Sequence, residues 1–257
     1  MNNIILKIFY CLKSVFIPRG VYNSMSYFDR DKKHEEIVAG WLEKYFYSQL
    51  NASVVNYMRV EEVSNADRIK EAQTLGIDLV LKDSNEEMYF IDEKSQTTYM
   101  NNPLPTFAFE LSYEYNGVTR KGWLLDENKK TNYYLLIYPR SYTKESYKEL
   151  SDIDDLDFAE IILLNKKRLI TELSNIGISL KSLIEIAKNI QTENKPIPIS
   201  DKSKNYVSIY KSSYLSEKPV NIVIKRTLLD TASSAIWEVH KNKIVEKKTF
   251  NKYWINN

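Results

Sequence analysis

The chain alternates between a stretch with helical hydrophobic spacing and short apolar runs bounded by polar turns. Between Asp29 and Leu50 apolar residues recur at intervals of three and four, which predicts an amphipathic helix; they are Ile37, Val38, Trp41, Leu42, Tyr45 and Phe46. The stretch "SVVNYMRV" predicts a strand because it is rich in β-branched residues. After a polar segment that ends at Gly76, "GIDLVLKDSNEEMYFIDEKSQ" predicts two strands joined by a turn.

The rest of the chain continues this mixture of strands and helices. Strands are predicted for the apolar runs "TFAFELSYEY", "TRKGWLL", "NYYLLIYP" and "FAEIILL", and helices for residues 166–175 and 179–191. The stretch "QTENKPIPISDKSKN" has the prolines and polar residues of a long loop, and "YVSIY", "VNIVIKRTL" and "AIWEV" predict strands before a basic tail. This order indicates a mixed α/β protein organised around one sheet. We expect a core over residues 1–190 and a basic extension or small subdomain over residues 191–257.

The first 20 residues, "MNNIILKIFYCLKSVFIPRG", are apolar but are interrupted by Lys7 and Lys13. They do not form the uninterrupted apolar span of roughly 20 residues that a membrane helix needs, and no small-residue cleavage site follows them. We therefore interpret the segment as an amphipathic helix that packs on the domain. Contact of residues 1–17 with a membrane surface is the less favoured alternative.

Composition excludes several kinds of site. The chain has one cysteine, Cys11, so it forms no internal disulfide, and a reducing, cytoplasmic location is the expectation. The two histidines, His34 and His240, lie far apart in the sequence, which argues against a zinc site of the HExxH or multi-cysteine kind. No glycine-rich phosphate loop of the Walker type is present, so nucleotide hydrolysis has little support.

The small net charge of +2 conceals an asymmetry. From Asn165 onward there are 17 Lys and Arg against 8 Asp and Glu, whereas the residues before it have 19 against 26. An acidic first part combined with a basic second part suits a metal-binding centre joined to a surface that binds a polyanion. A drift in lysine content along the chain is the alternative explanation.

The predicted hairpin carries charged residues where a simple strand does not require them. If Lys82 pairs with Met88, then Asp78 lies opposite Asp92, and opposed side chains emerge on the same face with Cβ atoms about 5 Å apart. Strand alternation places Lys94 on that face as well and turns the intervening Glu93 away. A slip of one residue would separate the two aspartates, so the register decides this prediction.

Two carboxylates at about 5 Å repel each other by roughly 3 kcal/mol at an effective dielectric constant of about 20. A protein keeps such a pair near its core when a cation compensates the charge. Lys94 is one candidate for that cation, and a divalent metal is the other. Carboxylate oxygens suit Mg²⁺ or Mn²⁺. A solvated strand end with local ion pairs is the alternative reading of Asp92, Glu93 and Lys94.

The pattern of Asp78, thirteen intervening residues and then Asp92-x-Lys94 resembles the PD-(D/E)xK motif of the restriction-endonuclease-like nucleases. The resemblance implies that Asp78 and Asp92 hold the metal together with the main-chain carbonyl of Glu93. It also implies that Lys94 positions or activates the attacking water. Gln96 extends the motif to DxKxQ, and some members of the superfamily have a polar residue there.

Many members of this superfamily have a further glutamate on the helix that precedes the sheet. Glu35 or Glu36, in "KKHEEIVAGW", stands in the right order for that role, and Glu36 is our preference. Two adjacent acids early in a helix are equally explained by a favourable interaction with its N-terminal dipole. The chain departs from the motif at Ile77, where the proline would stand, and its additional strands leave the subfamily open.

The resemblance implies a restriction-endonuclease-like fold, a mixed sheet flanked by helices, here with an additional C-terminal α+β region. It implies a hydrolase, a Mg²⁺-dependent endonuclease in which Mn²⁺ substitutes, acting on DNA, with RNA as the alternative and with a homodimer as a further expectation. A catalytically inactive scaffold that binds nucleic acid or protein is the competing hypothesis. A membrane-surface or partner-docking protein that acts through its N-terminal segment is a second one.

Three other features have two readings each. Glu110, within an apolar strand, is either a site residue or an outward-facing strand position. Residues 129–131, "KKT", either contact phosphate or only form a turn. The tail "HKNKIVEKKTFNKYW" mixes lysines with Phe250, Tyr253 and Trp254, which suits contacts to a nucleic-acid backbone and its bases, or else a charged surface strand.

Overall fold

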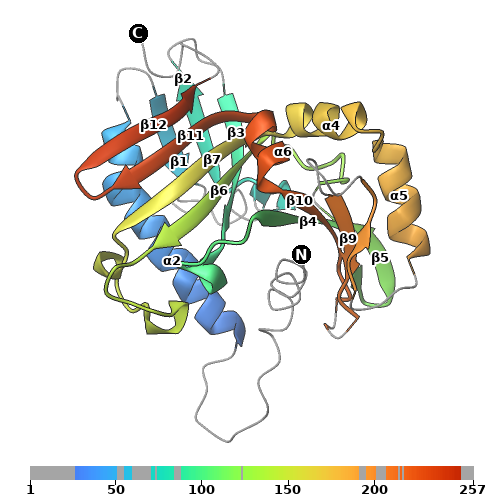
Figure 1. Cartoon of the computed structure of the whole chain (residues 1–257), viewed down its shortest axis with the longest axis horizontal. Helices are drawn as coiled ribbons and strands as arrows, with labels where there is room; N and C mark the ends of the chain where they lie inside the picture. Colours follow the sequence, from blue (N-terminus) through green and yellow to red (C-terminus); the bar gives the residue numbers. More distant parts are fainter. Residues whose placement is uncertain are drawn as a thin grey trace, which may run out of the picture.

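The computed structural model describes residues 27–50, 55–59, 71, 72, 74–83, 88–122, 124–190, 195–200, 207–213, 215 and 217–249. These residues form a mixed α/β structure with two β-sheets and four α-helices (Figure 1). The predicted N-terminal helix and the aromatic residues Phe250, Tyr253 and Trp254 lie outside the described residues. No helix of the described part is both long enough and apolar enough to cross a bilayer.

The larger sheet has seven strands in the order β1-β2-β3-β6-β7-β11-β12. Its members are β1 (Val55–Arg59), β2 (Leu79–Asp83), β3 (Met88–Ser95), β6 (Tyr133–Arg140), β7 (Phe158–Asn165), β11 (Ser233–His240) and β12 (Lys243–Thr249). Strands β3 and β6 run parallel, and every other neighbouring pair is antiparallel. The parallel pair requires a crossover, and the chain makes it through the second sheet.

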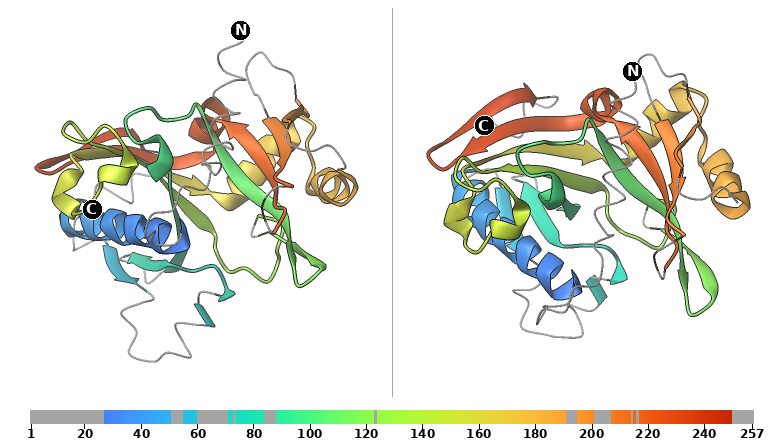
Figure 2. Two further views of the ribbon diagram at one scale, coloured as in Figure 1. Left: turned by 90° about the horizontal axis from the view of Figure 1, so that it is seen from below. Right: turned by 60° about the horizontal axis from the view of Figure 1, so that its bottom comes forward.

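The smaller sheet has five strands in the order β5-β4-β10-β9-β8, and all of its neighbouring pairs are antiparallel. Its members are β4 (Thr106–Tyr115), β5 (Val118–Lys121), β8 (Ile197–Pro198), β9 (Val207–Lys211) and β10 (Val220–Lys225). Strand β4 lies between β3 and β6 in the sequence, which connects the two sheets. Figure 2 shows the smaller sheet inclined against one side of the larger one.

Helices cover the larger sheet differently on its two faces. Helix α2 (Tyr27–Tyr45) packs on one face, where Trp41, Leu42 and Phe46 join a buried cluster with the odd-numbered residues of β3, β6 and β7. The opposite face packs against the smaller sheet, α4 (Lys166–Asn175), α5 (Leu180–Asn189) and α6 (Arg226–Ala232). Short 3-10 helices lie at Tyr47–Gln49, Thr97–Tyr99, Tyr147–Glu149 and Ile153–Asp155.

Most of the predicted elements are present, and three differ, two of them in the C-terminal part. Within the stretch "VNIVIKRTL", predicted as one strand, the observed strand ends at Lys225 and helix α6 follows. Leu228, Leu229 and Ala232 are buried at helical spacing, which accounts for the helix. The basic tail contains strand β12, which pairs with β11. Strand "TRKGWLL" is shorter than predicted and ends at Lys121.

The region after residue 190 is interleaved with the region before it. Strand β10 pairs with β4, and β11 pairs with β7. The boundary that we predict near residue 190 therefore does not separate two sheets. The sequence also indicated one sheet, and the structure contains two, because β4 pairs with β10 instead of joining β3 and β6.

Candidate functional site

The register of the β2–β3 hairpin is the one that the sequence predicts. Lys82 pairs with Met88 and Leu79 pairs with Ile91, so Asp78 lies next to β3 at the level of Asp92. The main-chain N–H of Glu93 donates a hydrogen bond of 2.9 Å to Asp78 Oδ2. This bond fixes the Asp78 carboxylate beside the part of β3 that carries Asp92.

Asp92 is a buried acid with a perturbed ionisation. Its side chain is 6% exposed, and its Oδ1 lies 2.6 Å from Lys94 Nζ. Burial is the main cause that raises the pKa of Asp92 to about 7; the charge of Lys94 opposes the rise and the charge of Asp78 adds to it. Asp78 and Asp92 therefore form the repelling pair that the sequence predicts, with Lys94 as one compensating cation.

Lys94 is held in its charged form. Burial alone would lower its pKa, but the negative charges of Asp92, Asp78 and Glu35 together raise the pKa above the ordinary value. Its side chain is still 36% exposed. At neutral pH it is thus an ammonium group that can reach a ligand in the adjacent cavity, rather than a free base.

Glu93 points to the opposite face of β3, as strand alternation predicts. Its carboxylate accepts two hydrogen bonds from Arg59, of 2.6 and 3.2 Å, and a further one from the Tyr47 hydroxyl. Arg59 also pairs with Glu43. This network ties β3 to β1 and to the end of α2, and the Glu93 main-chain N–H is the group that contacts Asp78. Sequence reasoning missed Arg59, whose single signal is a cation within the apolar strand β1.

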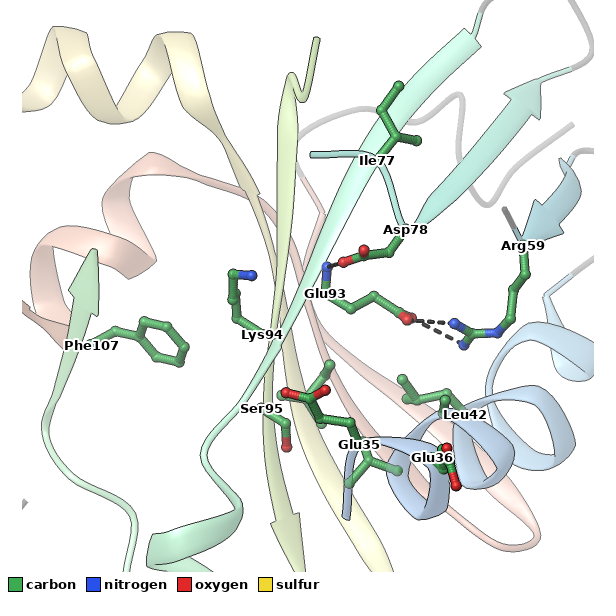
Figure 3. Close-up of a pocket in the computed structure, with 13 residues that line it drawn as sticks. Glu35, Glu36, Leu42, Arg59, Ile77, Asp78, Glu93, Lys94, Ser95 and Phe107 are labelled. Carbon is green, nitrogen blue, oxygen red and sulfur yellow. Dashed lines mark hydrogen bonds and ion pairs between the residues drawn. The ribbon is translucent and has the colours of Figure 1, made fainter. Parts of the chain in front are cut away.

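A cavity of about 440 Å³ opens beside these residues (Figure 3). It is lined by Glu35, Glu36, Val38, Ala39, Leu42, Arg59, Ile77, Asp78, Glu93, Lys94, Ser95, Phe107 and Ile137. In Figure 3 the Glu35 side chain points toward β3 near Ser95, whereas Glu36 lies farther along the helix surface. The charge of Glu35 contributes to the raised pKa of Lys94, and Glu35 and Glu36 both line the cavity, so the choice between them stays a prediction.

Charged residues from other elements surround the same centre. Lys166, at the start of α4, is near enough to Asp92 and Lys129 for their charges to affect its pKa, which burial lowers. Burial raises the pKa of Glu110 on β4, and the charges of Lys94 and Lys129 oppose that rise. The structure thus brings Glu110 toward the site. The sequence contained no signal for Lys166, since only the packing of α4 brings it there.

The loop of residues 126–131 supports the segment that leads to Asp78. Lys129 Nζ donates to the Thr74 carbonyl at 2.7 Å, and the Lys130 N–H donates to the Leu75 carbonyl at 3.0 Å. The Thr131 hydroxyl is buried and donates to the carbonyl of Gly76, which has a φ of 74°. For Thr131, this hydrogen bond within the turn explains the residue, and no contact with phosphate is needed to do so. Lys129 remains beside the charged centre.

Gln96 lies just beyond this cavity. Its Nε2 donates to the Thr106 carbonyl at 2.8 Å, and its main-chain N–H donates to the Ile137 carbonyl at 2.9 Å. These bonds secure the end of β3 between the two sheets. The Gln96 side chain therefore does not line the cavity that contains Asp78 and Lys94, and it faces a neighbouring cavity.

The oxygen donors at the hairpin suit a hard divalent cation. Two carboxylates and the adjacent Glu93 carbonyl match the preference of Mg²⁺ and Mn²⁺, which retain several waters when few protein ligands are present. Burial raises the pKa of Asp92 and the charge of Asp78 adds to the rise, so a bound cation would stabilise the carboxylate form. Within the described ranges no three His, Cys, Asp or Glu side chains form a metal-binding group.

Comparisons with known proteins find little similarity. No protein-family model matches the chain, and no curated protein matches its sequence. Among solved structures, the chain is similar to the restriction endonuclease BglI bound to its DNA recognition sequence, with a TM-score of 0.30 and 10% sequence identity. The match covers 94% of this chain and 91% of that chain. A TM-score this low does not establish a shared fold.

Proposed function

We propose that this protein is a metal-dependent nuclease that hydrolyses phosphodiester bonds in DNA. One observation supports the proposal above all others. Asp78, Asp92 and Lys94 converge on one face of the β2–β3 hairpin, beside a cavity of about 440 Å³. This proposal rests on the geometry and charge of the site, together with the resemblance of its motif to PD-(D/E)xK.

Asp78, Asp92 and the Glu93 carbonyl would hold Mg²⁺ or Mn²⁺. When bound, such an ion lowers the pKa of a coordinated water and stabilises negative charge on the phosphate. The chain prepares this position in two ways. The Glu93 N–H fixes the Asp78 carboxylate, and the Arg59–Glu93 ion pair turns the Glu93 side chain away so that its main chain faces the aspartates.

Lys94 would act as a cation in the reaction. Water oxygen bonds to phosphorus, the bond from phosphorus to one ester oxygen breaks, and the departing oxygen accepts a proton. The Lys94 ammonium can orient the water or neutralise a phosphate oxygen, and a preorganised positive charge is most effective where the negative charge develops. Glu35, whose charge acts on Lys94, is the glutamate that we assign to the helix position.

Two further lysines favour a phosphate ligand. Lys129 and Lys166 come from different elements and both lie near the charged centre. Together with Lys94 they offset the acids of the site, so that a polyanionic substrate can approach. The excess of basic residues after Asn165 would add salt-dependent affinity for the nucleic-acid backbone. DNA is the substrate that we propose, and RNA cleavage is an alternative outcome of the same assay.

The test is cleavage of plasmid and single-stranded DNA by the purified full chain with Mg²⁺, with Mn²⁺ and with EDTA. We expect cleavage that requires the metal and that Asp92→Asn removes. A control is Gln49→Ala, at an exposed residue that lines neither cavity, which should cleave as the wild type does. Metal-independent products, or full activity in Asp92→Asn, would contradict the proposal.

A second candidate is the same scaffold acting as a nucleic-acid-binding module without cleavage. The observation in its favour is the ion pair between Lys94 and Asp92, in which a protein cation already occupies one carboxylate oxygen. Salt-dependent DNA binding without products under any metal condition would support this candidate. Thermal unfolding with and without Mg²⁺ would then show whether the carboxylates bind the ion at all, since a ligand of the native state raises the melting temperature.

A further inference from the structure

A second cavity adjoins the proposed catalytic centre. It has a volume of about 250 Å³ and lies between the 3-10 helix Thr97–Tyr99 and strands β4, β9 and β10. Ser95 and Phe107 line both cavities, so the second cavity is a direct neighbour of the first. Its volume is below the roughly 300–1,000 Å³ of clefts that enclose drug-sized ligands, which suits a single ring system.

The residues around this cavity contain polar atoms that the fold leaves without hydrogen bonds. Three such atoms are Ser95 Oγ, Gln96 Oε1 and the Tyr99 hydroxyl, and all three are buried. The orientation of the Gln96 amide is set by the bond from its Nε2 to the Thr106 carbonyl, which leaves Oε1 as the free acceptor. A buried polar group without a partner is unfavourable, so a ligand that pairs with these atoms gains affinity.

The other walls supply flat and amide-bearing surfaces. Phe107 and Tyr210 contribute aromatic rings, and Asn221 contributes an amide with both donor and acceptor groups. Aromatic rings stack on planar heterocycles, and amides and hydroxyls pair with the edges of such rings. The three buried atoms are turned from solvent, so pairing with a ligand requires side-chain rotation, which is common at binding surfaces.

We infer that this second cavity binds the base of the nucleotide next to the cleaved phosphodiester. This inference rests on the proposed function, because the phosphate in the first cavity is what brings a base to the second. The alternative ligand is water alone, which would satisfy the same buried atoms without contributing to substrate binding.

The test uses a labelled single-stranded oligonucleotide and a series in which one nucleotide at a time is abasic. For the wild type, we expect removal of one base beside the cut to lower kcat/KM about tenfold, the effect of one stacked base. Tyr99→Phe and Gln96→Ala should each lower kcat/KM about fivefold on the intact oligonucleotide. On the oligonucleotide abasic at that position, neither substitution should cause a further loss.

Two controls and one binding measurement complete the design. Tyr142→Phe, at a residue that is 77% exposed, and Gln49→Ala should leave all rates unchanged. Because Gln96→Ala also removes a bond to the Thr106 carbonyl, Tyr99→Phe is the variant with the smaller structural effect. Fluorescence anisotropy with the same oligonucleotides measures affinity independently of cleavage.

The outcomes separate this inference from the proposed function. If the protein does not cleave but binds oligonucleotides with a dependence on one base and on Tyr99, the nuclease proposal fails and the base site stands. If it cleaves, and neither the abasic series nor Tyr99→Phe changes kcat/KM, the cavity holds only water and the inference is overturned. Binding without cleavage that is insensitive to every base overturns both.

Discussion

The ion pair between Arg59 and Glu93 offers a sharp test of how the site is held. The perturbation is Arg59→Met, which keeps the apolar stem and removes the guanidinium. Both side chains are 12% exposed, and two hydrogen bonds join them. In the variant the Glu93 carboxylate stays buried with only the Tyr47 hydroxyl as a described partner, so a charge is left without compensation.

The expected magnitude follows from this burial. Removal of one member of a buried ion pair costs about 3–5 kcal/mol, whereas replacement of both members by apolar residues is often neutral. Arg59→Met should therefore lower the free energy of unfolding by about 3–5 kcal/mol, a large part of the roughly 5–15 kcal/mol that stabilises a typical domain. The double variant Arg59→Met/Glu93→Met should recover most of that loss.

The assay is urea denaturation followed by the fluorescence of the buried Trp41 and Trp237, with the slope checked for constancy between variants. Cleavage is measured at a temperature where every variant is folded. The double variant should retain activity, since the Glu93 carboxylate is bound to Arg59 and Tyr47 and the Glu93 main-chain N–H is the group that contacts Asp78. A loss below about 1 kcal/mol for Arg59→Met, or a double variant as unstable as the single one, would refute the energetic reasoning. A folded double variant without activity would show that the Glu93 side chain takes part in the chemistry.

Three further predictions concern the centre and its supports. Lys94→Ala should reduce cleavage at least about 100-fold while circular dichroism and DNA binding stay near wild type, and full activity would contradict the assigned role. In the metal-free protein the pKa of Asp92 is raised from 3.8 to about 7, so its contribution to stability is complete below pH ~4 and is lost as the pH rises through 7. That loss, on the order of 4 kcal/mol, should disappear in Asp92→Asn when unfolding is measured across this range, and an unchanged pH profile would refute it. Gly122→Ala should cost about 1–3 kcal/mol in urea denaturation, because the new Cβ would lie 2.5 Å from the main-chain oxygen of Glu110, and a stability equal to that of the wild type would contradict this contact.

Local patterning predicted the elements and the core of the site. Strand alternation is a property of neighbouring residues, so the face shared by Asp78, Asp92 and Lys94 follows from the hairpin register alone, and the observed pairing of Lys82 with Met88 agrees with it. The helix predicted over residues 166–175 is present as α4. Ser179 is the N-cap of α5, in agreement with the preference for serine at that position.

Other features depended on how distant segments pack. The rotation of α2 against the sheet turns the Glu35 side chain toward β3 (Figure 3), a direction that the sequence of two adjacent helical glutamates does not specify before the helix is docked. Lys166 and Glu110 reach the centre because β7 and β4 flank it from different sheets. The second cavity exists only where the end of β3 meets β4, β9 and β10.

The sequence by itself therefore determined which residues share a face within one hairpin, and so predicted the acidic pair and its lysine. Tertiary structure alone decided which charges surround that pair and that a second cavity adjoins it. The physical reason is the distance along the sequence over which each effect operates. Side-chain alternation operates over a few residues, whereas these juxtapositions arise from a parallel β3–β6 crossover and from pairing between strands more than 100 residues apart, such as Phe109 with Ile222.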